Sequence, residues 1–332
     1  MSVWVDAVAR ARGLRTHRLP AGALAGLRRA PDLAALGRDL RLRGFPVDEG
    51  ERRAAALDLA TRRRAAAELR VLIRWCGPRA ALLPVIFEDE DRRSLRALLR
   101  GALQRAPADS RLAGLVPTPT LPERALAELA VARAPAAVGT LLTVWGHPFA
   151  PALRPVVAAD PPDPLAIEIA LDRAWASRAS AGARQGGPEV QRFVTDALDL
   201  ANAATVLALA GQAPRRAGEQ FLDGGHQLDR PTYSMLLARD RAAAARILAA
   251  TFAGTPYAGV LRTAPRHGFD DALLAARLAA VHDAARRAPL GPAPVLWYAL
   301  ELRGETVAVS RIVWRLALGA PPEALPAAVG AP

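Results

Sequence analysis

The sequence has no lysine: all 44 basic side chains among its 332 residues are arginine. A chain without lysine cannot form a Walker P-loop, a Schiff base or the phosphate-binding lysine of a protein kinase. The chain also has a single cysteine, Cys76, which excludes an internal disulfide scaffold. Cys76 stands beside Trp75 in an apolar stretch, so we interpret it as a small buried hydrophobic residue in a reducing compartment.

Long apolar runs are missing as well. No uncharged apolar run reaches the roughly 18 residues that a membrane-spanning helix needs. The N-terminal stretch carries Asp6, Arg10 and Arg12 where a secretory signal peptide requires an unbroken apolar region. We therefore expect neither a signal peptide nor a transmembrane helix, so that any association with a membrane goes through a partner or a surface.

The net charge of +12 invites a nucleic-acid interpretation. The arginine runs are short and scattered, however, and aromatic residues do not alternate with them as they do in many binding surfaces for single strands. The bias towards Arg, Ala and Pro, together with a single asparagine, is typical of a GC-rich genome. We predict solvated helix faces and no nucleic-acid partner, and keep a helical-repeat scaffold or an RNA-binding adaptor as the alternative.

The patterns that are present are those of helices. From Val190 to Ala201 apolar residues recur at the spacing of one helix face, and Pro188 fits the first turn of such a helix. A second helix is predicted from about Ala54 to Trp75. Strand-type alternation of any length is missing, and 52% hydrophobic residues suffice for a core. The predicted fold class is therefore all-α, with short and medium helices joined by Pro-rich turns.

An internal repeat organises these helices. The segment from Leu19 to Leu27 matches that from Leu121 to Leu129 at six of nine positions, and a weaker copy begins at Leu228. An acidic residue recurs later in each copy, with spacings of 108 and 106 residues, at Asp91, Asp199 and Glu305. We predict three related helical units of about 107 residues, 1–110, 111–217 and 218–332, arranged as a ring, an arc or a funnel.

Candidate catalytic and metal-ligating residues form no recognisable site. None of the five histidines stands three or four residues from another His, Cys or Glu, and no Gly-x-Ser-x-Gly motif occurs. The cluster Glu88 to Asp91 suits paired carboxylates, but its place just before the apolar residue Leu95 favours the N-terminus of a helix. We predict no catalytic residue, no metal and no cofactor, and retain a metal- or Cys76-dependent enzyme only as a distant alternative.

The pair Gly224-Gly225 allows two interpretations. Its backbone N–H groups suit an anion cradle, whereas its place before a helix predicted from about Asp229 or Arg230 suits a turn with positive φ. We favour the turn.

Five segments stand out in order along the chain: the Ala-Arg-rich start from Trp4 to Arg12, Asp91-Arg-Arg-Ser-Leu95, Asp199-Leu-Ala-Asn202, Phe221-Leu-Asp-Gly-Gly225, and Pro289-Leu-Gly leading to Tyr298. Together they resemble the C subunit of the V-type ATP synthase, whose eukaryotic counterpart is the d subunit. The sequence departs from the family pattern mainly between Glu301 and Pro321, where Arg303 and Gly304 replace a Lys-Glu pair.

The resemblance implies a funnel of three helical units on the cytoplasmic face of a membrane rotor ring, with the tip of the central stalk inserted into it. Such a subunit is peripheral and non-catalytic, handles no small-molecule substrate, and transmits torque during proton or sodium transport. The residues to which we assign a structural role in the repeats are Asp91, Asp199, Asn202, Gly224, Gly225 and Glu305.

Overall fold

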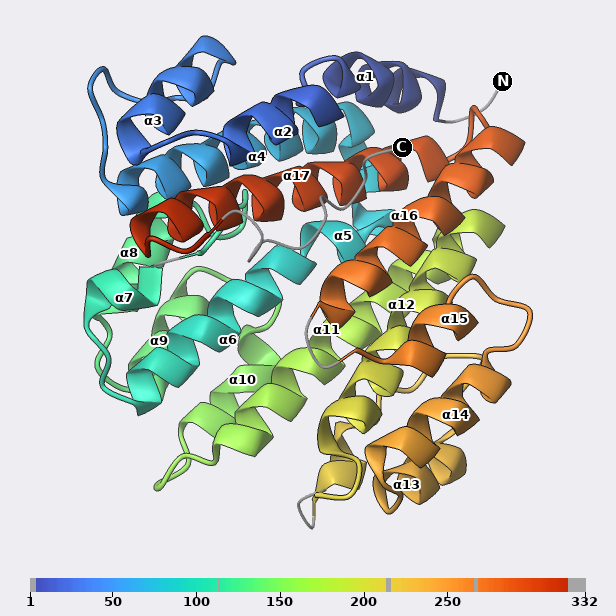
Figure 1. Cartoon of the computed structure of the whole chain (residues 1–332). Coiled ribbons are helices and arrows are strands. Elements are labelled where there is room, and N and C mark those ends of the chain that lie inside the picture. Colours follow the sequence, from blue (N-terminus) through green and yellow to red (C-terminus); the bar gives the residue numbers. More distant parts are fainter. Residues whose placement is uncertain (1–3, 113, 213–215, 266–267, 322–332) are drawn as a thin grey trace. The chain divides into compact units, whose positions relative to one another are not determined.

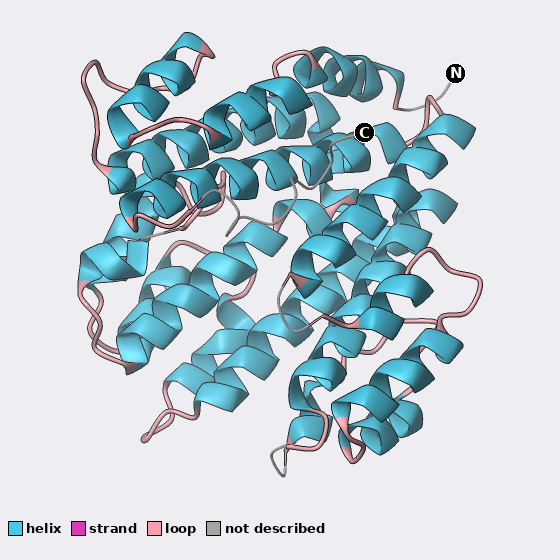
Figure 2. Cartoon of the chain, in the orientation of Figure 1, coloured by secondary structure: helices cyan, strands magenta, loops and turns pink. Residues whose placement is uncertain are grey.

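The structure is a computed structural model that describes residues 4–112, 114–212, 216–265 and 268–321. Throughout these ranges the regular secondary structure is helical, without any strand (Figure 2). The all-α fold class is therefore confirmed. Both predicted long helices are present, as α4 (Ala54–Cys76) and α12 (Pro188–Leu209), and Pro188 lies in the first turn of α12.

The chain folds into two compact units, and the first combines residues from both ends of the sequence: 1–77, 113–119 and 270–332. Its two long helices, α4 and α17 (Ala293–Ala317), lie side by side, and α1 and α2 pack on α17 (Figure 1). The other helices of this unit are α1 (Val5–Arg15), α2 (Ala21–Arg28), α3 (Leu33–Leu42) and α16 (Phe269–Arg287), which begins at the unit boundary.

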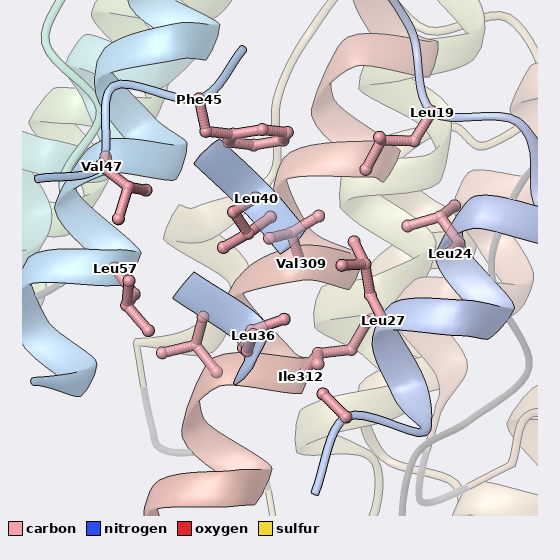
Figure 3. Packing of buried hydrophobic residues seen from close by; sticks show 13 residues of the cluster. Leu19, Leu24, Leu27, Leu36, Leu40, Phe45, Val47, Leu57, Val309 and Ile312 are labelled. Carbon is pink, nitrogen blue, oxygen red and sulfur yellow. The ribbon is translucent and has the colours of Figure 1, made fainter. Parts of the chain in front are cut away.

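The core of this first unit joins the start of the chain to its last helix. Leu27 of α2 and Leu36 and Leu40 of α3 are fully buried against Val309 and Ile312 of α17 (Figure 3). Burial of each such side chain stabilises the fold by about 1.5–3 kcal/mol. The apolar face of α17 therefore holds the N-terminal helices in place.

The second unit contains residues 78–112 and 120–269. Its long helices α11 (Pro164–Gly186) and α12 are joined at Gly187 and pack against each other (Figure 1). Two 3-10 helices, Gly77–Leu82 at the unit boundary and Ala217–Gln220, accompany the α-helices. The remaining helices are α5 (Pro84–Phe87), α6 (Asp89–Leu103), α7 (Ala108–Leu112), α8 (Glu123–Val131), α9 (Pro135–Val144), α10 (Ala150–Val157), α13 (Arg230–Leu237), α14 (Arg241–Thr251) and α15 (Ala258–Thr263).

Three pairs of short helices follow the three repeated leucines. Leu19 precedes α2 and α3, Leu121 precedes α8 and α9, and Leu228 precedes α13 and α14. Each leucine is buried. The second helix of every pair is followed by a glycine with positive φ, at 78° in Gly44, 66° in Gly146 and 79° in Gly254. The division of the chain at residues 110 and 217 stays a prediction.

Candidate functional site

The repeated acidic residues are all buried, and each accepts hydrogen bonds from the turn that leads into a helix pair. We call Asp91, Asp199 and Glu305 the repeat acids; their exposed fractions are 0%, 0% and 4%. Asp199 accepts hydrogen bonds from the turn before Leu228, and Asp91 accepts one from the turn before Leu121. Glu305 accepts one from the turn at Leu19. In all three places a buried carboxylate thus accepts a hydrogen bond from a backbone N–H or a hydroxyl of the turn, as the predicted structural role requires.

Asp199 holds the turn that contains the glycine pair. Its Oδ2 accepts the backbone N–H groups of His226 at 2.8 Å and Gln227 at 2.9 Å, and its Oδ1 accepts that of Leu228 at 3.1 Å. Gly225 makes this approach possible, since a Cβ atom there would lie 2.1 Å from Oδ1. The anion that this turn cradles is thus the chain's own carboxylate.

Asn202, one turn along α12 from Asp199, fixes the other side of the same loop. Its amide nitrogen donates to the carbonyl oxygen of Leu222 at 2.8 Å, and its Oδ1 accepts the Leu222 N–H at 2.8 Å. Gly224 between these contacts has a φ of 105°. The predicted turn is confirmed, and the next helix begins at Arg230 with Asp229 as its N-cap.

Asp91 lies near the start of α6. Its Oδ2 accepts the hydroxyl of Thr120 and is 3.4 Å from Nε2 of His147. The other ring nitrogen, Nδ1, accepts the backbone N–H of Phe149 at 3.2 Å, so in the neutral ring the proton is on Nε2 and points at Asp91. The buried His147 side chain therefore links α6 to the segment before α10 within the second unit.

Glu305 is the repeat acid of the first unit. Its Oε2 accepts the backbone N–H of Leu19 at 2.7 Å, and Arg18 and Arg64 lie 3.6 and 3.8 Å from its carboxylate. Burial raises the pKa of Glu305, and the Leu19 N–H and the two arginines only partly oppose this effect. The contact joins α17 to the segment before α2, 286 residues earlier in the sequence.

A wider polar network surrounds this contact, and the sequence analysis did not find it. Glu301 binds Arg15 at 2.7 Å and Arg18 at 2.9 Å, and Tyr298 donates to Glu68 at 2.6 Å. Burial, followed by the hydrogen bond to Glu68, raises the pKa of Tyr298. The one available signal was the spacing of Glu301 and Glu305, which places two acids on one face of a helix.

The acidic cluster from Glu88 to Asp91 lies at the N-terminus of α6, as predicted. Its N-cap residue Glu88 makes no side-chain capping bond and instead binds Arg178 at 2.5 Å. Asp89 binds Arg92 at 2.6 Å and Arg93 at 2.8 Å. Glu88 and Asp89 are thus engaged in ion pairs within the second unit, which leaves the interpretation as an acid–base pair without support.

The candidate metal-ligating and nucleophilic residues do not form a site in the described ranges. In the described ranges no group of three or more His, Cys, Asp or Glu side chains could hold a metal ion, and Cys76 is buried. Among the helices of those ranges, none is both long and apolar enough to cross a membrane. The repeat acids and the helices that they position are therefore the features of the structure that bear on function.

Comparison with known proteins decides the family. A family model for the ATP synthase (C/AC39) subunit matches residues 7–325. This chain belongs to the ATP synthase (C/AC39) subunit family. Within that family it is similar to the C subunits of the V-type ATP synthase from two strains of Thermus thermophilus. One of these relatives is 30% identical over 241 residues, and the other is 30% identical over 240 residues. Both alignments cover 70% of this chain and 68% of the relative.

Membership of the ATP synthase (C/AC39) subunit family confirms the resemblance that the sequence motifs indicated. The matched range includes all six residues to which we assigned a repeat role. Four of them, Asp199, Asn202, Gly224 and Gly225, meet in one turn of the second unit, while Asp91 and Glu305 each hold a separate turn. Their role as signature residues of the repeat stays a prediction.

Proposed function

We propose that this chain is the non-catalytic central rotor subunit of a V-type ATP synthase or ATPase. In this role it couples the central stalk of the ATP-hydrolysing headpiece to the membrane rotor ring during proton or sodium transport. The observation that carries the proposal is the family match over residues 7–325, which reaches from the first helix to beyond the last. The partners are accordingly the central-stalk subunits and the ring, and the chain binds peripherally on the cytoplasmic face.

The internal contacts support a coupling role because torque passes only through a body that resists deformation. Each repeat acid is itself buried and accepts hydrogen bonds from a turn, so the short helix pairs are held at their entry points as well as by their apolar faces. In the first unit the Glu305–Leu19 contact ties the last helix to the N-terminal segment. Such contacts limit the bending of the turns under load.

The test is co-purification of the tagged chain from its native membranes, followed by activity measurements on the complex. We expect central-stalk and ring subunits to co-purify, and we expect a complex depleted of the chain to hydrolyse ATP without pumping ions. Restoring the chain should restore pumping. ATP hydrolysis by the homogeneous chain, or pumping that is unchanged by depletion, would contradict the proposal.

A variant can separate coupling from assembly. Asp199→Asn keeps the side-chain shape but replaces one acceptor oxygen by a donor that faces backbone N–H groups. We expect the depleted complex to bind this variant and to recover less pumping per ATP hydrolysed than with the wild type. Gln191→Ala, on an exposed position of the same helix, is the matched control and should recover pumping fully.

A further inference from the structure

The last helix carries a buried arginine with two nitrogens that lack a hydrogen-bond partner. Arg315 of α17 has an exposed fraction of 6%, and its Nε and Nη2 atoms are both buried and unpaired. Arg311, one turn earlier on the same face, binds Asp271 at 2.6 Å. Two arginines of one helix face therefore differ: Arg311 has its counter-charge on Asp271, whereas Nε and Nη2 of Arg315 have no hydrogen-bond partner among the described residues.

Other arginines with a buried unpaired nitrogen have an anionic or aromatic neighbour. Nε of Arg62 lacks a hydrogen bond, but this residue lies 3.2 Å from Asp58 and donates to the carbonyl of Leu115. In the same way Arg18 binds Glu301, Arg64 lies near Glu305, Arg96 binds Asp172, and Arg10 lies over the Trp75 ring. Within the part of the chain that the structure describes, Arg315 is the arginine with two such nitrogens.

The end of α17 does not satisfy Arg315 either. A cation near a helix C-terminus commonly binds the last carbonyl groups. Here those carbonyls already accept backbone N–H groups: Leu318 donates to Trp314 at 3.0 Å, Gly319 to Leu316 at 3.2 Å, and Ala320 to Arg315 at 3.0 Å. These carbonyls are engaged by the backbone, and neither Nε nor Nη2 of Arg315 has a hydrogen-bond partner among the described residues.

Nε and Nη2 are the two donors of one edge of the guanidinium group. This edge matches the two oxygens of a carboxylate or a phosphate, which it binds through two parallel hydrogen bonds. A buried charge without such a partner is strongly unfavourable. We propose that the Nε–Nη2 edge of Arg315 is an oxyanion-binding site, which takes a carboxylate or phosphate group. The site does not depend on the proposed function of the chain.

Two sources can supply the anion. The first is this chain, in which Glu323 is the sole acidic residue after Arg315; it lies outside the described residues. The second is a free anion or an acidic group of another molecule. Both offer the same pair of oxygens, so a Glu323→Gln variant distinguishes them.

The experiment measures the melting temperature of the full-length chain during titration with inorganic phosphate at constant ionic strength. Phosphate that binds the folded chain alone raises its melting temperature. We expect this rise in the wild type and in Arg311→Gln, and its loss in Arg315→Gln. Arg315→Lys keeps the charge but lacks the forked edge, so we expect about tenfold weaker binding.

The Glu323→Gln variant shows which anion binds the Nε–Nη2 edge of Arg315. If Glu323 fills the site, this variant responds to phosphate at lower concentration than the wild type; if the anion comes from outside, the two respond alike. Without phosphate, Arg315→Gln should melt at the same or a higher temperature than the wild type if the anion comes from outside, because it removes an unpaired charge, and at a lower temperature if Glu323 fills the site. The proposal is overturned if both Arg315 variants respond like the wild type, or if neither the wild type nor Glu323→Gln responds.

Discussion

Asp199 illustrates why an acidic residue recurs at this point of the chain. The turn before Leu228 presents three successive backbone N–H groups to the interior, and a single carboxylate accepts all of them. A neutral side chain with one acceptor oxygen could not do so. The carboxylate is completely buried, so its charge is compensated mainly by these hydrogen bonds.

Asp199→Ala and Asn202→Ala should both destabilise the second unit. The first leaves three N–H groups unpaired and the second leaves both backbone groups of Leu222 unpaired, at about 1–3 kcal/mol for each buried group. Thermal unfolding followed by circular dichroism measures the effect, with Gln191→Ala as the control on the same helix. Melting temperatures equal to that of the wild type in both variants would show that the turn does not need these contacts.

Gly225→Ala should destabilise the chain by about 1–3 kcal/mol, because the new methyl group overlaps Oδ1 of Asp199. The matched control is Gly26→Ala in α2, where a Cβ meets nothing within 4 Å. That change should stabilise by about 0.5–1 kcal/mol, since alanine favours the helix interior. Denaturant unfolding of the two variants gives the comparison, and effects of the same sign would argue against the close approach.

The raised pKa of Glu305 predicts how the stability of the folded chain changes with pH. Its pKa is raised by burial, so the folded chain retains this proton at pH values where the unfolded chain has lost it. The contribution of Glu305 to stability therefore falls as pH rises from the unfolded pKa, about 4.3, to the raised folded pKa. Glu305→Gln does not titrate and still offers an oxygen to the Leu19 N–H. The stability of this variant relative to the wild type should thus increase from about pH 4 to about pH 7 in denaturant unfolding, and a decrease would contradict the prediction.

At the scale of the elements, arginine ion pairs connect α6 to α11. Arg92 binds Asp172 at 2.6 Å, Arg96 binds the same carboxylate, and Arg100 binds Glu168 at 2.6 Å. Burial opposes the charge of Arg92, but Asp89 and Asp172 outweigh it and raise the pKa of that guanidinium. The arginines that give the chain its net charge therefore also hold helices together.

Asp172→Ala should destabilise the second unit by about 3 kcal/mol, because it leaves the largely buried Arg92 and Arg96 without their shared carboxylate. Glu168→Ala, one turn earlier on α11, removes the partner of the half-exposed Arg100 and should cost at most about 1 kcal/mol. Hydrogen exchange of α6 and α11 reports the difference between the two variants. Equal effects would mean that the degree of burial does not set the strength of these pairs.

The elements were largely predictable, whereas the contacts between them were not. The apolar period from Val190 and the glycine pair before Asp229 are local patterns, so they predicted α12 and the turn before α13. The pairing of Glu305 with Leu19 joins residues 286 positions apart, and no local pattern encodes it. Likewise, the three repeat acids were visible as a spacing, but the donors that they bind became known only from the folded chain.

At the scale of the whole molecule, the first unit is assembled from the two ends of the sequence and the second from its middle. The first unit cannot form until α17 has been made, because its core needs Val309 and Ile312 as well as Leu27. The second unit draws on one nearly continuous segment. Formation of the two cores therefore depends on different parts of the chain, which a pair of mutations can separate.

Leu27→Ala and Leu207→Ala test this separation. Each removes a buried leucine side chain, at 0% and 2% exposure, and should cost about 2–5 kcal/mol. Leu27→Ala should speed hydrogen exchange in α2, α4 and α17, since these helices share its core, and should leave α12 protected. Leu207→Ala should have the opposite pattern. If either variant deprotects both units to the same extent, they unfold as a single cooperative body, and the damage spreads because neither core is stable without the other.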